Sequence, residues 1–224
     1  MGILGFICIL LPVLYALILI FLPAPISLTQ IGSVIDGNGL KRDYIWKFEM
    51  SPNAVLAVIA AEDQLFTEHF GFDLESIEKA LEYNAKKKGK KKRGASTISQ
   101  QVAKNVFLWQ GRSWLRKGLE IYFTLLIEVL WSKATIMKHY LNTIEMGPGI
   151  FGIEAAANSY FKKSADKLTR EEAASIAASL PNPKKFTVKP RSIWVNLRTP
   201  WILEQMDQLR EDPEIKQLLN EFGK

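Results

Sequence analysis

Residues 51–73 read SPNAVLAVIAAEDQLFTEHFGFD, and the fold prediction starts from this stretch. The serine and proline that open it are typical of a helix start, because serine caps the first turn and proline is tolerated at the first helical position. The apolar residues that follow predict a helix that runs to a pair of carboxylates, Glu62 and Asp63. Aromatic residues come directly afterwards and would exclude water, so burial would raise the carboxyl pKa towards the range of a general acid or base. The alternative is a solvated helix end beside a structural His69.

The rest of the chain also predicts helices. Helical patterns occupy four further segments: residues 73–85, residues 113–142, an alanine-rich segment from a Thr169–Glu172 capping box to Pro181, and residues 200–220. In the longest of these segments the apolar stripe consists of Leu115, Leu119, Tyr122, Leu126 and Val129. Strand-like alternation is scarce, so we expect a mainly α fold.

The N-terminal segment predicts a membrane anchor. Residues 3–23 carry no charge over 21 positions, and as a helix they would span roughly the 30 Å of a membrane core. No basic region precedes this run and no A-x-A cleavage site follows it, which argues against a cleaved signal peptide. We therefore predict an anchor over residues 1–24, a linker over 25–47 and a folded body over 48–224. The positive-inside rule weakly favours a cytoplasmic body, because the nearest cations follow the run.

Composition excludes several classes of protein. The 224 residues are 48% apolar and 23% charged, which excludes intrinsic disorder and fits one domain of ordinary size. A single cysteine and two histidines exclude a disulfide scaffold and a cysteine-rich or histidine-rich metal centre. The net charge of +6 comes from one segment, Lys86–Arg93, which holds seven cations. This segment is either a solvated loop or a contact for anionic lipid head groups, and it lacks the interleaved aromatics that favour nucleic-acid binding.

Two polar clusters follow the carboxylate pair. Residues 94–105 combine small residues, hydroxyls and paired amides, which suit either the binding of sugar hydroxyls and phosphate oxygens or an amide-rich surface helix. A phosphate-binding P-loop is excluded, because Ala95 stands where the lysine is required. In the second cluster Arg116 and Lys117 share a helix face with Glu120, at spacings of four and three residues. Apolar residues follow Glu120 at once, so this carboxylate needs partners or a role beyond an ordinary ion pair.

The carboxylate pair and these two clusters, in this order and spacing, closely resemble the glycosyltransferase domain of peptidoglycan polymerases, glycosyltransferase family 51. Two further blocks, residues 133–156 and 168–183, agree with the family pattern, and Met146, where many relatives carry an aromatic residue, is a minor departure. The resemblance implies a mainly α, lysozyme-like helical glycosyltransferase domain over residues 48–224, with one N-terminal transmembrane helix. The chain is too short for a fused transpeptidase domain, so we expect a monofunctional biosynthetic enzyme.

The resemblance implies polymerisation of lipid II. In this reaction the 4-hydroxyl of an acceptor sugar attacks the anomeric carbon of a lipid-diphosphate donor and inverts it to a β-1,4 bond. Glu62 matches the catalytic base of the family, and Glu120 matches a second carboxylate that assists the base or orients Lys117. The residues that match substrate-binding positions, or that we rank beside them, are Asp63, Ser96, Gln100, Gln101, Lys104, Arg112, Arg116 and Lys117.

The resemblance also implies the surroundings of the enzyme. It implies no metal site built from side chains and no organic cofactor, whereas Mg²⁺ or Mn²⁺ would bind through the substrate diphosphate. The expected partners are lipid II, the growing glycan chain, membrane lipids and other cell-wall synthesis or division proteins, and not nucleic acid. Because the substrate lies in the bilayer, we expect a single-pass protein of the bacterial inner membrane with its body on the periplasmic side, against the weak charge signal. Phe107, Leu108, Trp109 and Trp114 alternate with arginines and predict an interfacial patch beside that membrane.

The alternative function is a lysozyme-like hydrolase or lytic transglycosylase that acts on glycan strands. Such an enzyme would share the fold and the catalytic glutamate. The cationic residues at the positions of the diphosphate site argue against it, because glycan cleavage does not need them.

Overall fold

The structure is a computed structural model that describes residues 2–46, 49–86, 94–111 and 113–223, with side chains described from Leu10 onward. Within these ranges the chain forms eleven α-helices, one 3₁₀ helix and three short strands, so the mainly helical prediction is confirmed. In chain order the elements are α1 (Gly2–Phe21), α2 (Leu28–Ile35), β1 (Lys41–Arg42), α3 (Pro52–Glu62), α4 (Leu74–Lys86), α5 (Ile98–Phe107), α6 (Trp114–Leu130), α7 (Lys133–Thr143), β2 (Glu145–Gly147), β3 (Ile150–Phe151), α8 (Ile153–Phe161), the 3₁₀ helix η1 (Ala165–Lys167), α9 (Arg170–Ser179), α10 (Ile193–Leu209) and α11 (Pro213–Leu219).

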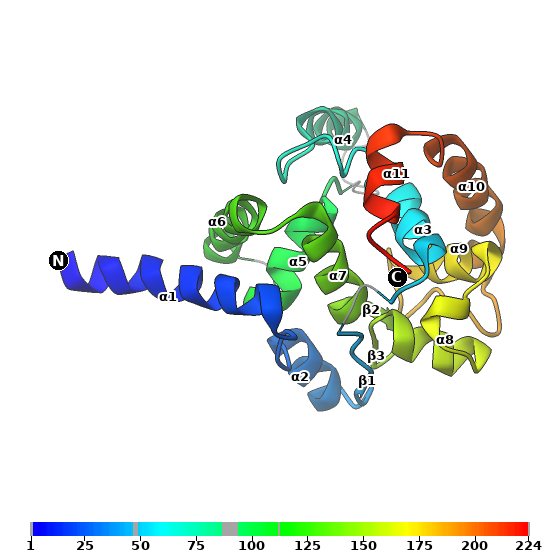
Figure 1. The fold of residues 1–224 in the computed structure, drawn as a ribbon, viewed down its shortest axis with the longest axis horizontal. Helices are drawn as coiled ribbons and strands as arrows, with labels where there is room; N and C mark the ends of the chain where they lie inside the picture. Colours follow the sequence, from blue (N-terminus) through cyan, green and yellow to red (C-terminus); the bar gives the residue numbers. More distant parts are fainter. Residues whose placement is uncertain (1, 47–48, 87–93, 112, 224) are drawn as a thin grey trace.

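Helix α3 is the helix that the opening stretch predicts, and it lies among α9, α10 and α11 (Figure 1). Ser51 is its N-cap, with the side-chain oxygen accepting from the backbone N–H of Asn53 at 3.2 Å, and Pro52 occupies the first turn. Every side chain from Ala54 to Ala60 is buried, as expected for a helix that is apolar all round. The helix ends at Glu62, so a fully packed element carries this carboxylate.

The long helical pattern over residues 113–142 is two helices in the structure. Helix α6 ends at Leu130, and Ser132 caps α7 by accepting from the backbone N–H of Thr135 at 3.1 Å. The predicted apolar stripe of α6 faces the core only in part: Leu126 packs against the core, whereas Leu115 and Val129 are 71% and 69% exposed. The buried residues of α6 are Glu120, Thr124, Ile127 and Glu128. The polar groups among them can be buried because ion pairs and hydrogen bonds satisfy them.

The C-terminal part also differs from the single helix expected over residues 200–220. Helix α10 already begins at Ile193 and continues through Pro200, whereas α11 starts at Pro213 behind the N-cap Asp212. The capping box of Thr169 and Glu172 that predicts the alanine-rich helix is present at the start of α9.

The segment over residues 25–47, expected to be a linker, contains helix α2 and strand β1. A capping box starts α2, since Ser27 and Gln30 exchange hydrogen bonds of 3.1 and 3.3 Å. Strand β1 pairs in parallel with β3, which pairs antiparallel with β2, giving the order β1-β3-β2. The hydrogen-bonded strands attach this segment to the body.

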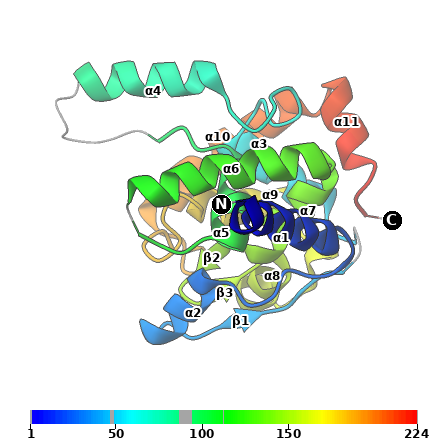
Figure 2. The same ribbon diagram turned by 90° about the vertical axis from the view of Figure 1, so that its left-hand side faces the viewer.

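The C-terminal half of α1 packs against the body, while its N-terminal turns project away (Figures 1 and 2). Ala16 and Leu19 are buried, and their carbonyls accept from Trp131 Nε1 and His139 Nε2, each at 2.8 Å. Burial lowers the pKa of His139 to about 4, so its ring is neutral at pH 7. No helix in the described part of the chain combines the length and hydropathy that crossing a membrane requires.

Candidate active site

Glu62 ends α3 at the edge of a cavity, and its carboxylate is bound by an amide. Gln101 Nε2 donates to Glu62 Oε2 at 2.8 Å, and the Tyr140 hydroxyl donates to Gln101 Oε1 at 3.2 Å. Burial raises the pKa of Glu62, while the hydrogen bond from Gln101 and the charge of Arg198 act to lower it. A carboxylate whose pKa is raised in this way is a suitable general base near neutral pH.

Asp63, the second carboxylate of the pair, faces away from the cavity and fixes the loop behind Glu62. It accepts from His69 Nε2 and from the backbone N–H of Ile98, both at 2.9 Å. Lys133 donates to the His69 carbonyl at 2.7 Å. Gly71 in the same loop has a φ of +79°, and a Cβ at this position would lie only 2.8 Å from Thr124 Cγ2, so the loop requires a glycine here. His69 therefore makes a structural contact, and Asp63 joins α3 to the start of α5.

The first polar cluster begins helix α5. Thr97 is its N-cap and forms a capping box with Gln100, whose Oε1 accepts from the Thr97 N–H at 3.0 Å. Thr97 Oγ1 also donates to the Gly71 carbonyl at 2.7 Å. Gln100 is therefore both a helix cap and a lining residue, and its amide nitrogen is left for a ligand.

The second polar cluster gathers cations around a buried carboxylate. Glu120 is only 4% exposed and accepts from Arg116 Nη1 at 2.7 Å and from Lys117 Nζ at 2.5 Å. Lys104 of α5 lies close by, and its pKa is lowered by burial and by the charges of Arg116 and Lys117. Three cations against one carboxylate leave this part of the site positive, which suits an anionic group in the substrate.

One cavity of about 780 Å³ brings these groups together. Eight of the ten predicted site residues line it: Glu62, Ser96, Gln100, Gln101, Lys104, Arg116, Lys117 and Glu120. Asp63 is not among its lining residues, because its carboxylate is engaged behind the cavity. The predicted Arg112 lies outside the described residues, as do residues 87–93 of the basic segment.

Comparison with known proteins gives the family of this chain. Residues 29–207 match the Transglycosylase family. The chain is similar to a biosynthetic peptidoglycan transglycosylase of Shewanella oneidensis, with 58% identity over 73% of this chain and 69% of the relative. It is also 52% identical to the proteins of that name from Escherichia coli and Shigella sonnei, over 87% of this chain and 83% of each relative. The chain belongs to the transglycosylase family. The resemblance drawn from its motifs is therefore confirmed.

The sequence does not predict one wall of this transglycosylase cavity. Helix α2 and the segment after α9 form much of it, with the lining residues Leu28, Thr29, Gly32, Ser33, Asp36, Leu180, Pro181, Pro183 and Lys184. An ion pair of 3.5 Å between Asp36 and Lys184 joins the two segments. Glu145 adds another carboxylate to the cavity, and burial raises its pKa. The Ser27-x-x-Gln30 spacing was the one local signal of α2, because it matches a capping box.

The predicted interfacial patch is only partly exposed. Trp114 and Trp109 are 92% and 39% exposed, whereas Leu108 is buried. Phe107 stacks on Phe123 with ring centroids 4.6 Å apart, so it belongs to the core between α5 and α6. The prediction is therefore wrong for Phe107 and Leu108, whose side chains pack inward.

Among the described residues, no three His, Cys, Asp or Glu side chains lie close enough together to hold an ion. The carboxylate of Glu120 is already paired with two cations, which would oppose a divalent ion there. Binding of Mg²⁺ or Mn²⁺ through the substrate diphosphate stays a prediction.

We expect Glu62→Gln to raise the melting temperature at neutral pH. Because burial raises the folded-state pKa, ionised Glu62 destabilises the folded protein above that pKa, and the penalty disappears below the unfolded pKa of about 4.3. The gain should be a few degrees at about pH 8, since about 1 kcal/mol corresponds to 2–4 °C in a chain of this size. It should vanish as the pH falls to about 4. Thermal melting followed by circular dichroism checks this, and an equal gain at every pH would contradict it.

Proposed function

We propose that this chain polymerises lipid II into linear β-1,4 glycan strands, inverting the anomeric carbon of the donor MurNAc and releasing polyprenyl diphosphate. The chain is a peptidoglycan glycosyltransferase, an enzyme of cell-wall biogenesis, as its family and its relatives indicate. The observation that carries the finer proposal is the single cavity in which a desolvated carboxylate, Glu62, lies with a cationic cluster. An inverting sugar transfer with a diphosphate leaving group needs these two elements.

Glu62 is the proposed general base. Its carboxylate takes the proton of the acceptor 4-hydroxyl while that oxygen forms a bond to the anomeric carbon of the donor. The bond from that carbon to the diphosphate oxygen breaks on the opposite face, which inverts the configuration. Gln101 donates to one carboxylate oxygen at 2.8 Å, and this contact orients the other oxygen towards the acceptor.

The cationic cluster is the proposed site of the leaving diphosphate. As the glycosidic bond breaks, negative charge develops on the leaving oxygen, and fixed cations stabilise that charge without reorganising. Arg116 and Lys117 are held by Glu120, so this carboxylate positions two cations. Lys104 adds a third cation to this cluster, and burial and the neighbouring charges of Arg116 and Lys117 lower its pKa. A divalent ion, where the reaction uses one, would be carried by the diphosphate itself and would add further positive charge.

We place the active site beside the inner membrane, on its periplasmic side, in a lysozyme-like body behind one anchor. The uncharged run over residues 3–23 supports the anchor, and the lipid substrate supports the location. Trp131 and His139 bind carbonyls of α1, so the helix leaves the body in a defined direction. Other cell-wall synthesis or division proteins remain expected partners at this membrane.

The test is to incubate the purified protein with lipid II and Mg²⁺ in detergent and to separate the products. We expect glycan strands that a muramidase degrades, together with released polyprenyl diphosphate. The lysozyme-like alternative predicts instead that lipid II is untouched while cell-wall suspensions clear. That result would overturn the proposal and establish a hydrolase or lytic transglycosylase.

Gln101→Leu should move the acid limb of kcat/KM to higher pH. The amide of Gln101 lowers the pKa of Glu62 against the effect of burial, so its loss should raise that pKa and delay deprotonation of the base. Tyr140→Phe is the matched control, because it removes the contact to Gln101 but keeps the hydrogen bond to Glu62. Initial rates with lipid II over a pH series provide the measurement. An unchanged acid limb in Gln101→Leu would mean that the titration of Glu62 does not cause this limb.

A further inference from the structure

A buried ion pair that the proposed reaction does not use lies behind the active site. Glu128, near the end of α6, and Lys133, at the start of α7, are joined at 2.8 Å, and their side chains are only 3% and 22% exposed. Neither residue is among those that line the active-site cavity. Burial of two charges is costly, and a buried pair is often no more stable than an apolar pair of similar volume. Stability alone is therefore a poor explanation for this pair.

The ion pair connects four segments of the chain. Glu128 Oε1 accepts from Lys133 Nζ and also from the Ser99 hydroxyl of α5 at 2.5 Å, so one oxygen links α5, α6 and α7. Lys133 Nζ donates in addition to the carbonyl of His69 at 2.7 Å. The same amine lies 4.8 Å from the ring centroid of Phe66, which belongs with His69 to the loop after α3. Because hydrogen bonds to charged groups are strong, this network fixes the four segments relative to one another.

On one side the network reaches the carboxylate base. The ring of His69 holds Asp63 at 2.9 Å, and Asp63 is the chain neighbour of Glu62. The same loop passes directly against Glu128, because a Cβ at Gly71 would lie 3.0 Å from Glu128 Cγ. The ion pair therefore restricts where the end of α3, and with it Glu62, can lie.

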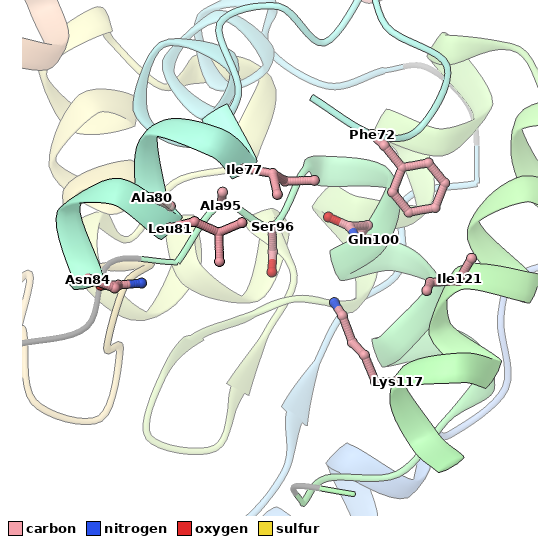
Figure 3. A pocket seen from close by; sticks show the side chains of 10 residues that line it. All are labelled: Phe72, Ile77, Ala80, Leu81, Asn84, Ala95, Ser96, Gln100, Lys117 and Ile121. Atoms are coloured by element: carbon pink, nitrogen blue, oxygen red, sulfur yellow. The ribbon is translucent and has the colours of Figure 1, made fainter. Parts of the chain in front are cut away.

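On the other side the network reaches the cationic cluster. Ser99 lies in the first turn of α5, and Glu128 lies on the same helix as Glu120, about 12 Å along its axis. Figure 3 shows Lys117 of α6 pointing towards Gln100 of α5 at the border of the active site. The hydrogen bond from Ser99 to Glu128 therefore sets how α5 lies on α6, and with it the arrangement of the groups between the two helices.

We propose that Glu128 and Lys133 are positioning residues of the sugar transfer, which hold the base and the cationic cluster at the separation that the reaction requires. The inference rests on the proposed function. In that reaction the acceptor oxygen attacks one face of the anomeric carbon while the diphosphate leaves from the other, so both groups must be in place at once. Gln101 holds Glu62 locally, and Glu120 holds two of the cations. The buried network sets what these local contacts do not, which is the distance between the two groups.

The experiment replaces the ion pair by a neutral pair of nearly the same shape, Glu128→Gln together with Lys133→Met. This exchange leaves no unpaired buried charge, so the protein should fold. With lipid II in detergent we expect kcat to fall about 10–100-fold, because a misplacement of about 1 Å can cost about 10²-fold. KM should stay within about threefold of wild type, since the contacts that hold each substrate-binding group are unchanged and only the alignment in the transition state is lost.

Two further variants separate positioning from stability. Ser99→Ala removes only the link from α5 to Glu128, and it should lower kcat several-fold without a change in KM. Lys163→Met together with Glu172→Gln is the matched control, because it neutralises another partly buried ion pair, of 2.9 Å, whose residues do not line the active-site cavity. Glutamine can keep the capping box at the start of α9, so this control should fold and retain the wild-type kcat.

Rates are compared below the melting transitions of all variants. The inference is overturned if the double variant and Ser99→Ala both keep the wild-type kcat, or if the loss appears in KM alone. It is also overturned if the control pair lowers kcat equally, because loss of stability would then explain the effect. If the double variant does not fold, the kcat of Ser99→Ala decides. A wild-type protein that is inactive with lipid II would instead refute the proposed function.

Discussion

Glu62→Gln is expected to lower the polymerisation of lipid II by about 10²–10⁴-fold, the usual contribution of a positioned general base. The amide has nearly the shape of the carboxylate and can still accept from Gln101 through its oxygen, but it cannot take the acceptor proton. The variant should therefore fold and bind substrate while turnover is lost. Initial rates of strand formation, measured at saturating lipid II, give the comparison with wild type.

A control glutamate shows whether the effect is specific to the cavity. Glu171 lies on α9, its side chain is 62% exposed, and it pairs with Arg191 at 2.9 Å. It is not among the residues that line the active-site cavity. Glu171→Gln should keep the rate within a few-fold of wild type, because an exposed ion pair contributes little. Activity of Glu62→Gln within the same few-fold range would refute its assignment as the base.

The parts of the molecule that the sequence predicts well depend on local spacings. A cap, a proline and an apolar run predict α3 and the position of Glu62 at its end. Glu120 and its two cations lie three and four residues apart on one helix, so their pairing also follows from local geometry. Hydrophobic periodicity shows which residues share one side of a helix, but it does not show which side faces the core. On α6 the inner face holds Glu120 and Thr124, because Thr124 donates to the Glu120 carbonyl at 2.6 Å and ion pairs satisfy the carboxylate.

The remaining wall of the active site depends on contacts between distant parts of the chain. Helix α2 has eight residues, too few for a clear period, and its position over the cavity depends on contacts such as the ion pair of Asp36 with Lys184. The role of Gln100 is a further example. Its amide suits a sugar ligand and a capping box equally well, and only the three-dimensional structure shows that its oxygen accepts from the Thr97 N–H. These choices arise from tertiary packing, which one sequence does not display.

Lys104→Ala is expected to lower turnover of lipid II by about 10²–10³-fold and also to raise KM. A fixed cation at the leaving diphosphate stabilises charge that is greatest in the transition state, so its loss should affect kcat as well as binding. Burial and the nearby charges of Arg116 and Lys117 lower the pKa of Lys104, which indicates a cation held without a full counter-charge until an anion arrives. Helicity and melting should stay close to wild type.

Two further variants make the prediction for Lys104 specific. Lys216→Ala removes a lysine that pairs with Glu211 at 2.7 Å on the surface of α11, and it should leave the kinetics unchanged. Lys104→Arg keeps a positive charge that does not titrate, so it should recover part of the rate. Because the pKa of Lys104 is below that of an ordinary lysine, the alkaline limb of kcat/KM should move to higher pH in the arginine variant. Normal kinetics in Lys104→Ala would mean that the diphosphate binds elsewhere, and the cationic part of the cavity would then need another ligand.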